Sequence, residues 1–206
     1  MANFTAQDVQ ALRKETGAGM MDAKKALTET DGAVEAAKDL LRERGIAKAG
    51  KRAGRAQSEG VVGAYLHSQA GRPVIGVLVG LGSETDFVAK SAEFIDTAND
   101  IAMHVAAARP QWVSRSDVPE DTVAREMKLI AVEARNEGKP DGIVEKIVEG
   151  RINSYYRENV LEDQVFVRSD RFEGTVGELV QRLAIKMGEN ISIQPWRESR
   201  SGRPDI

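Results

Sequence analysis

The apolar run at residues 74–82 constrains the fold of this chain more than any other segment. It is rich in β-branched residues and contains no charged side chain, which is typical of a buried strand. Residues 89–94 instead have the composition of a helix. The turn between the two consists of Thr85, Asp86, Phe87 and Val88. A strand-to-helix turn of this kind holds its side chains outward on a rigid base.

Phe87 has two interpretations at this position. In the first, the ring is a core residue beneath the following helix, and Asp86 is the N-cap of that helix. In the second, the ring is offered to another molecule, because an aromatic side chain contributes a large apolar surface to a contact. The local sequence leaves both interpretations open.

Composition and charge describe an ordinary globular chain. It has 206 residues, of which 41% are hydrophobic and 30% charged, enough to bury a sizeable core in one small and one larger domain. The net charge is -3, with acidic and basic residues interleaved. Such a balance gives no overall attraction to nucleic acid or to an anionic membrane.

The residue types exclude several kinds of chemistry. The chain has no cysteine and two histidines, so thiol catalysis, disulfides and a cysteine-histidine zinc site are ruled out. No phosphate-binding loop with a lysine-serine pair is present. We therefore expect no enzymatic activity, cofactor, metal or direct nucleotide binding. The start of the chain does not resemble a signal peptide, and the longest apolar run is too short to span a bilayer, which predicts a cytoplasmic protein.

Residues 1–46 have the pattern of a compact module of three helices. Thr5 opens the first helix with an approximate capping box, and the glycines at 17–19 end it. Asp31 is expected to cap the third helix, and Gly45 is expected to stop it. Residues 47–58 follow as a basic, glycine-containing segment, predicted to be a mobile linker.

Residues 59–197 are predicted to form an α+β core domain, and residues 198–206 a disordered tail. The predicted elements are a hairpin turning at 69–72, a helix ending before Pro110, a helix after Pro119, two shorter helices from 141 to 160, a strand at 164–167, a helix through 176–185 and a strand at 190–193. His67 and His104 are both placed on polar surfaces. The fold class is thus a three-helix module followed by a helix-rich domain with a small, mostly antiparallel sheet.

Three segments resemble bacterial elongation factor Ts in its short, single-core form. They are residues 12–27, the turn at 85–89 and Gly188-Glu189-Asn190-Ile191, and the resemblance covers roughly residues 3 to 195. It implies that the first module is similar to ubiquitin-associated domains. It also implies a guanine-nucleotide exchange factor, which binds elongation factor Tu with GDP, promotes GDP release and stabilises the nucleotide-free GTPase until GTP binds.

The resemblance also implies which residues contact the partner. In the core domain they are Thr85, Asp86, Phe87 and Val88, and in the first module Met20, Met21 and Arg13. Two consecutive methionines cannot both face one helix interior, and their flexible side chains suit an adaptable contact surface. The alternative role for these methionines is to fill the gap beneath the glycine turn, which consists of residues 17–19.

The resemblance to short members of this family implies a homodimer, in which residues 59–197 are the dimerisation domain as well as the core. Longer members carry a second half-core and an inserted coiled coil, for which this chain is expected to have no room, so two copies would replace the duplicated core. We expect the chain to bind neither nucleic acid nor a membrane directly. The chain departs from the usual family residues at Gly82-Ser83 and at Gln194-Pro195-Trp196, and the second departure affects contacts near the last strand.

Two functions of other classes compete with nucleotide exchange. One is a non-enzymatic adaptor that binds another protein through the three-helix module and keeps Phe87 in its core. The other is an RNA-associated factor that uses the cations of residues 48–55. The absence of aromatic residues from that segment disfavours RNA, because bases stack on aromatic rings.

Overall fold

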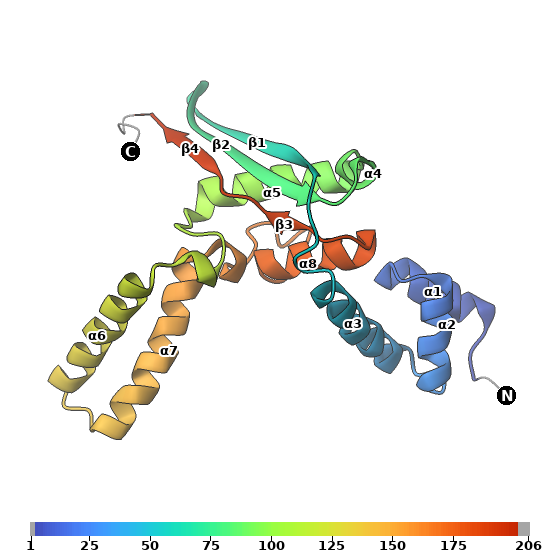
Figure 1. The fold of residues 1–206 in the computed structure, drawn as a ribbon, viewed down its shortest axis with the longest axis horizontal. Helices are drawn as coiled ribbons and strands as arrows, with labels where there is room; N and C mark the ends of the chain where they lie inside the picture. The colour runs from blue at the N-terminus through green and yellow to red at the C-terminus, as the bar shows by residue number, and fades with distance from the viewer. Residues whose placement is uncertain (1–2, 202–206) are drawn as a thin grey trace.

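The computed structural model describes residues 3–201, which form three parts in a row (Figure 1). Helices α1 to α3 lie on one side, a sheet covered by helices lies in the middle, and a pair of long helices projects on the other side. The fold is therefore α+β, as the sequence predicts. None of the helices in the described part of the chain is long and apolar enough to cross a bilayer.

The first part is a three-helix module with a small core of its own. It contains α1 (Ala6–Thr16), α2 (Met20–Glu29) and α3 (Val34–Gly50). Thr5 and Asp8 form the predicted capping box, and Gly17 ends α1 in the left-handed conformation at φ 70°. The buried side chains are Val9, Leu12, Ala23, Ala26, Leu27, Ala37 and Leu41.

Helix α3 differs from its prediction at both ends. Ala33 precedes its first turn, whereas Asp31 lies two residues earlier in a left-handed turn at φ 49°. Gly45 does not stop the helix, which continues to Gly50. A Cβ on Gly45 would lie 2.8 Å from Cγ2 of Ile185. The glycine thus lets α3 approach the core domain, and this packing outweighs its poor helix propensity.

The segment predicted as a mobile linker is partly helical and is bonded to the core domain. Arg52 donates to the backbone oxygen of Ala184 at 3.4 Å. Gln57 donates to the backbone oxygen of Asn190 at 3.2 Å, and the Asn190 side chain donates to the backbone oxygen of Arg55 at 2.8 Å. These bonds tie residues 52–57 to the C-terminal part of the fold.

The sheet is built around an antiparallel hairpin of β1 (Glu59–Gln69) and β2 (Arg72–Ser83). The predicted turn is confirmed: Ala70 and Gly71 both have positive φ, at 50° and 76°, the combination that matches the twist of a two-residue hairpin. β3 (Ser192–Ile193) and β4 (Arg197–Arg200) pair with the other edge of β2, both antiparallel. The expected disorder after residue 197 is therefore wrong for residues 198–200, and residues 202–206 lie outside the described part.

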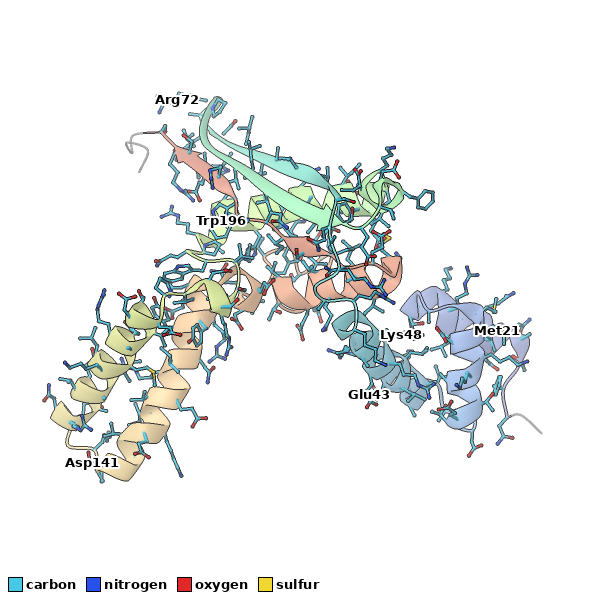
Figure 2. The ribbon with its side chains drawn as sticks, viewed as in Figure 1. Met21, Glu43, Lys48, Arg72, Asp141 and Trp196 are labelled. Atoms are coloured by element: carbon cyan, nitrogen blue, oxygen red, sulfur yellow. The ribbon has the colours of Figure 1, made fainter. Side chains whose placement is uncertain are left out.

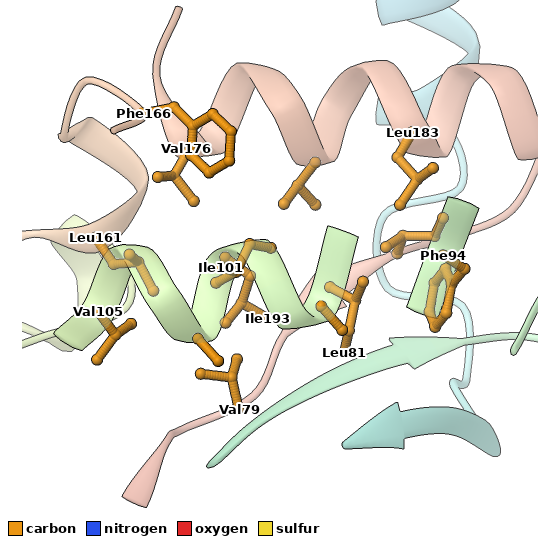
Figure 3. Close-up of a cluster of buried hydrophobic side chains, with 14 of the residues drawn as sticks. Val79, Leu81, Phe94, Ile101, Val105, Leu161, Phe166, Val176, Leu183 and Ile193 are labelled. Carbon is orange, nitrogen blue, oxygen red and sulfur yellow. The ribbon is translucent and has the colours of Figure 1, made fainter. Parts of the chain in front are cut away.

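The main core lies between the sheet and two helices, α5 (Ala92–Ala108) and α8 (Val176–Met187). Figure 3 shows α5 over β2, with side chains of α8 pointing toward it from the far side. The cluster includes Val79, Leu81, Phe94, Ile101, Val105, Leu161, Phe166, Val176, Leu183 and Ile193. Gly63 allows β1 to lie directly on α5, because a side chain there would collide with the backbone of Ala98.

The third part is an antiparallel pair of helices, α6 (Glu120–Asn136) and α7 (Asp141–Asn159), joined by a short loop (Figure 1). It has a separate small core of Ile130, Ala134, Val144 and Val148. Residues 141–159 form one helix where the sequence suggested two. The helices predicted after Pro119 and from residue 141 thus pack together as one helical hairpin.

Two further predictions fail around His104. This residue is fully buried instead of lying on a polar face. Its Nε2 is 2.9 Å from the side-chain oxygen of Gln164, and its Nδ1 accepts from the backbone N–H of Val167 at 3.2 Å. The predicted strand at 164–167 is absent, and the segment makes a single bridge between Val165 and Thr175 after a short 3-10 turn, η2 (Leu161–Asp163). Its backbone groups therefore bond to His104, to the carbonyl of Gly174 and to the N–H of Val176 instead of to a full strand.

Candidate functional site

The turn at residues 84–89 joins the end of β2 to a one-turn helix, α4 (Asp86–Ala89). Thr85 is the N-cap of this helix, and its Oγ1 accepts from the backbone N–H of Val88 at 3.5 Å. Asp86 is therefore the first helical residue and not the cap. Val88 and Ala89 are buried against the core, so the turn is anchored from below.

Phe87 points away from this anchor. Its side chain is 85% exposed, so the interpretation that places it in the core is wrong. An aromatic ring gains little by standing in water, because burying a phenylalanine contributes roughly 1.5 to 3 kcal/mol. Phe87 is thus a large apolar group that the fold presents without covering it.

Asp86 lies beside Phe87 and carries a full negative charge. Its carboxylate accepts from Nζ of Lys90 at 2.6 Å, one helical turn later. The hydrogen bond from Lys90, followed by the attraction of its charge, lowers the pKa of Asp86 below its usual value. Both side chains are exposed, so the pair can rearrange readily when another charged or polar group approaches.

Two glutamates hold the turn from behind. Oε2 of Glu189 accepts from the backbone N–H groups of Glu84 at 2.9 Å and Thr85 at 3.1 Å, and Oε1 accepts from Oγ1 of Thr85 at 2.5 Å. In return, Oε1 of Glu84 accepts from the backbone N–H of Asn190 at 2.6 Å. The sequence segment 188–191 resembled the family, but its residues were not predicted to be part of the site.

Ser83 supports the same turn from inside. It is fully buried, and its Oγ donates to the backbone oxygen of Thr85 at 3.1 Å. The departure from the family pattern at Gly82-Ser83 is therefore compatible with the turn, as a hydroxyl satisfies the carbonyl there. Gln194-Pro195-Trp196, the other departure, joins β3 to β4 and lies away from α4.

The predicted residues of the first module lie on its surface. Met20 and Met21 begin α2 after the glycine turn and are 42% and 74% exposed, while Ala23, Ala26 and Leu27 fill the interior. Figure 2 shows Met21 on the outer side of the module. Arg13 is also exposed, on the last turn of α1. The methionines are thus not sealed beneath the glycine turn.

Lys186 connects the two groups of predicted residues in space. A Cβ on Gly17 would lie 3.3 Å from Cγ of Lys186, so the glycine turn contacts the end of α8. Nζ of Lys186 pairs with Glu93, in the first turn of α5 just after α4, at 2.5 Å. The glycine turn and the Phe87 turn therefore both adjoin the same end of the core domain.

The described residues contain no arrangement for metal binding. Within residues 3–201, no three histidine, aspartate or glutamate side chains lie close enough together to hold a metal ion. What the site offers is an exposed ring, a neighbouring carboxylate and two exposed methionines. Aromatic side chains and methionine are enriched in the contact surfaces of proteins, so this arrangement is suited to binding another protein.

The family model described as "Elongation factor TS" matches residues 8–193. The chain belongs to the elongation factor Ts family. Proteins named "Elongation factor Ts" are similar over nearly their whole length: the one from Moorella thermoacetica is 49% identical over 191 residues, which cover 93% of this chain and 92% of that protein. The one from Alkaliphilus oremlandii is 50% identical over 200 residues, which cover 97% and 90%.

A third elongation factor Ts, from Caldanaerobacter subterraneus subsp. tengcongensis, is 46% identical over 199 residues, which cover 97% of each chain. The resemblance inferred from the motifs is thus confirmed at the level of the family. Membership of the elongation factor Ts family supports a role in translation elongation.

Proposed function

We propose that this chain is a guanine-nucleotide exchange factor that binds elongation factor Tu in its GDP form and promotes GDP release. The observation that carries the proposal is the 85% exposure of Phe87 on an anchored turn. The ring, with Asp86 beside it, inserts between helices next to the bound nucleotide and disturbs the magnesium site and the phosphate-binding loop. No covalent bond is made or broken, and the reaction takes place in the cytoplasm, where translation occurs.

A single ring cannot supply the whole effect. Burying Phe87 contributes roughly 1.5 to 3 kcal/mol, whereas shifting a binding equilibrium by about four decades needs around 5.5 kcal/mol. Met20, Met21 and Arg13 supply further contacts from the first module, on the same GTPase. Because coupling between two ligands is reciprocal, a factor that weakens GDP binding must itself bind best to the nucleotide-free partner. GTP then expels the factor in the same way.

We also propose that two copies of the chain associate through the outer face of the sheet. Val62, Leu66 and Leu78 are exposed on this face. Their partners across the β1-β2 ladder are Gly80, Gly76 and Ala64 respectively. Each large side chain thus stands opposite a small residue, and two such faces can interdigitate as packed sheets do. Residues 59–197 are the dimerisation unit in this proposal.

The adaptor alternative loses part of its basis in the structure, since it required a buried Phe87. The RNA alternative is weakened by the pairing of its cations. Lys48 pairs with Asp22 at 3.0 Å, Arg55 with Glu84 at 3.5 Å, and Arg52 with a backbone oxygen. Cations that already have protein partners neutralise fewer phosphates.

Release of fluorescent GDP from elongation factor Tu tests the main proposal. With the wild-type chain we expect fast release, and with Phe87→Ala release slowed by about tenfold or more, because the burial energy of the ring is lost. Val165→Ala is the matched control, as Val165 is also an exposed apolar residue of the core domain. Both variants should keep the wild-type circular dichroism spectrum. Unchanged GDP release with Phe87→Ala would refute the proposed role of the ring.

A further inference from the structure

The Phe87 turn is anchored at its far end by the buried Val88 and Ala89, and its start depends on other contacts. Helix α4 is four residues long, and a single helical turn is not stable by itself, because ordering its first residues costs more than its few hydrogen bonds return. The ring itself is exposed and packs against nothing that would fix it. The direction in which Phe87 points must therefore be set by contacts elsewhere in the turn.

The strongest of these contacts come from Glu189. One side chain receives three hydrogen bonds from the two residues before Asp86, at 2.9, 3.1 and 2.5 Å. Bonds to a carboxylate are shorter and stronger than those between neutral groups. Glu189 is separated from Thr85 by 104 positions in sequence, so this is a tertiary link and not a local cap.

The same link is reinforced by a second one in the opposite direction. Glu84 accepts from the backbone N–H of Asn190 at 2.6 Å, so each glutamate binds the backbone beside the other. Glu189 is itself placed by Gly188, which ends α8 in the left-handed conformation at φ 75°. A rigid helix end therefore holds the start of the turn at several points.

We infer that Glu189 is the positioning residue of the exposed turn: its carboxylate keeps Phe87 and Asp86 in the orientation in which they meet elongation factor Tu. The inference rests on the proposed function. Without the carboxylate, α4 samples other orientations, and only a fraction of molecules present the ring correctly. The apparent affinity for elongation factor Tu equals the intrinsic affinity multiplied by that fraction.

A double-mutant cycle tests the inference with the full-length chain, elongation factor Tu and fluorescent GDP. We expect Glu189→Ala to lower the efficiency of GDP release by about tenfold, equivalent to a coupling of ~1.4 kcal/mol. In the Phe87→Ala background the same change should have little further effect, because its action passes through the ring. Glu189→Gln should recover part of the loss, since its amide oxygen still accepts from the two backbone N–H groups.

Asp117→Ala is the matched control. Asp117 likewise accepts from a backbone N–H and a hydroxyl, both of Ser114, at 2.8 Å each. It follows the C-terminal end of α5, whereas the turn precedes the other end of that helix. Its loss should change GDP release by less than about twofold, at a comparable cost in stability. Amide hydrogen exchange should rise at residues 84–88 in Glu189→Ala and not in Asp117→Ala.

The possible failures are distinguishable. If Phe87→Ala alone leaves GDP release unchanged, the proposed function of the ring fails and the inference fails with it. If Phe87→Ala slows release but the effects of the two substitutions simply add, Glu189 has only a structural role and the inference alone is overturned. The inference would also be overturned if Glu189→Gln promoted GDP release no better than Glu189→Ala.

Discussion

His104 and Gln164 are hydrogen-bonded to each other inside the core, with 2.9 Å between Nε2 of the ring and the side-chain oxygen of the amide. The other ring nitrogen accepts a backbone N–H from Val167, so the imidazole is neutral and carries its hydrogen on Nε2. Burial lowers the pKa of His104 below its ordinary value of 6.5, against a smaller opposing effect of the bond to Gln164.

We predict a loss of stability on acidification that depends on His104. The pKa is lower in the folded than in the unfolded chain, so the unfolded state takes up the proton first. The contribution of neutral His104 to the free energy of unfolding is complete above pH 6.5. It declines as the pH falls from there toward the pKa of His104 in the folded chain, by at most about 1.4 kcal/mol per pH unit. Urea unfolding at pH 7 and pH 5 measures this loss of stability. We expect the free energy of unfolding to differ less between the two pH values in His104→Asn. An identical pH dependence in both proteins would contradict the prediction.

Glycines on the two faces of the hairpin should differ in their tolerance of alanine. A side chain at Gly63 would collide with the backbone of α5, whereas one at Gly76 would meet only a flexible end of Leu66 at 3.3 Å. We expect Gly63→Ala to lower the free energy of unfolding by about 1 to 3 kcal/mol or more, and Gly76→Ala to have a much smaller effect. Thermal unfolding followed by circular dichroism compares them. Equal melting temperatures would show that β1 does not lie as closely on α5 as described.

The outer sheet face can be tested as a dimer surface with two equally exposed leucines. Leu78 on the sheet and Leu129 on α6 are each 52% exposed. Leu78→Glu should give the mass of a single chain by light scattering at micromolar concentration, because like charges would meet at the centre of the interface. Leu129→Glu should leave the wild-type mass unchanged. A single-chain mass for the wild-type protein with full exchange activity would refute the homodimer.

The exposed methionines of the first module should contribute to binding and not to folding. Met20 is 42% exposed and Met127, on α6, is 40% exposed, so the pair allows a matched comparison. We expect Met20→Gln to raise the concentration of the chain needed for half-maximal GDP release by severalfold to about tenfold, as part of the burial energy of the side chain is lost. Met127→Gln should leave it unchanged. Equal effects of both substitutions would remove Met20 from the proposed contact.

Features set by neighbouring residues were predictable from the sequence. The capping box at Thr5, the two-residue turn at Ala70-Gly71 and the strand-to-helix turn before Phe87 all follow from local geometry. The local pattern did not decide whether Phe87 is covered, since an aromatic residue after a buried strand is compatible with either outcome. Its exposure depends on how the turn packs against the rest of the fold.

Features set by distant parts of the chain were missed for a common reason. Gly45 has the local character of a helix stop, but contact with Ile185 makes a glycine necessary within a continuing helix. His104 lies off the obvious apolar stripe of α5, yet the amide of Gln164 gives it a buried partner. Glu189 had no visible role until the fold brought it to Thr85. Hydrogen bonds across 60 or more positions leave no periodic trace in a sequence.

The bonds between residues 55–57 and Asn190 bear on how the chain is made. They join positions 133 and 135 residues apart, so the first module can fold early during synthesis. Its attachment to the core domain through these bonds, however, cannot form until residue 190 has been added. A nascent chain stalled before residue 190 would therefore carry a folded three-helix module that is still untethered.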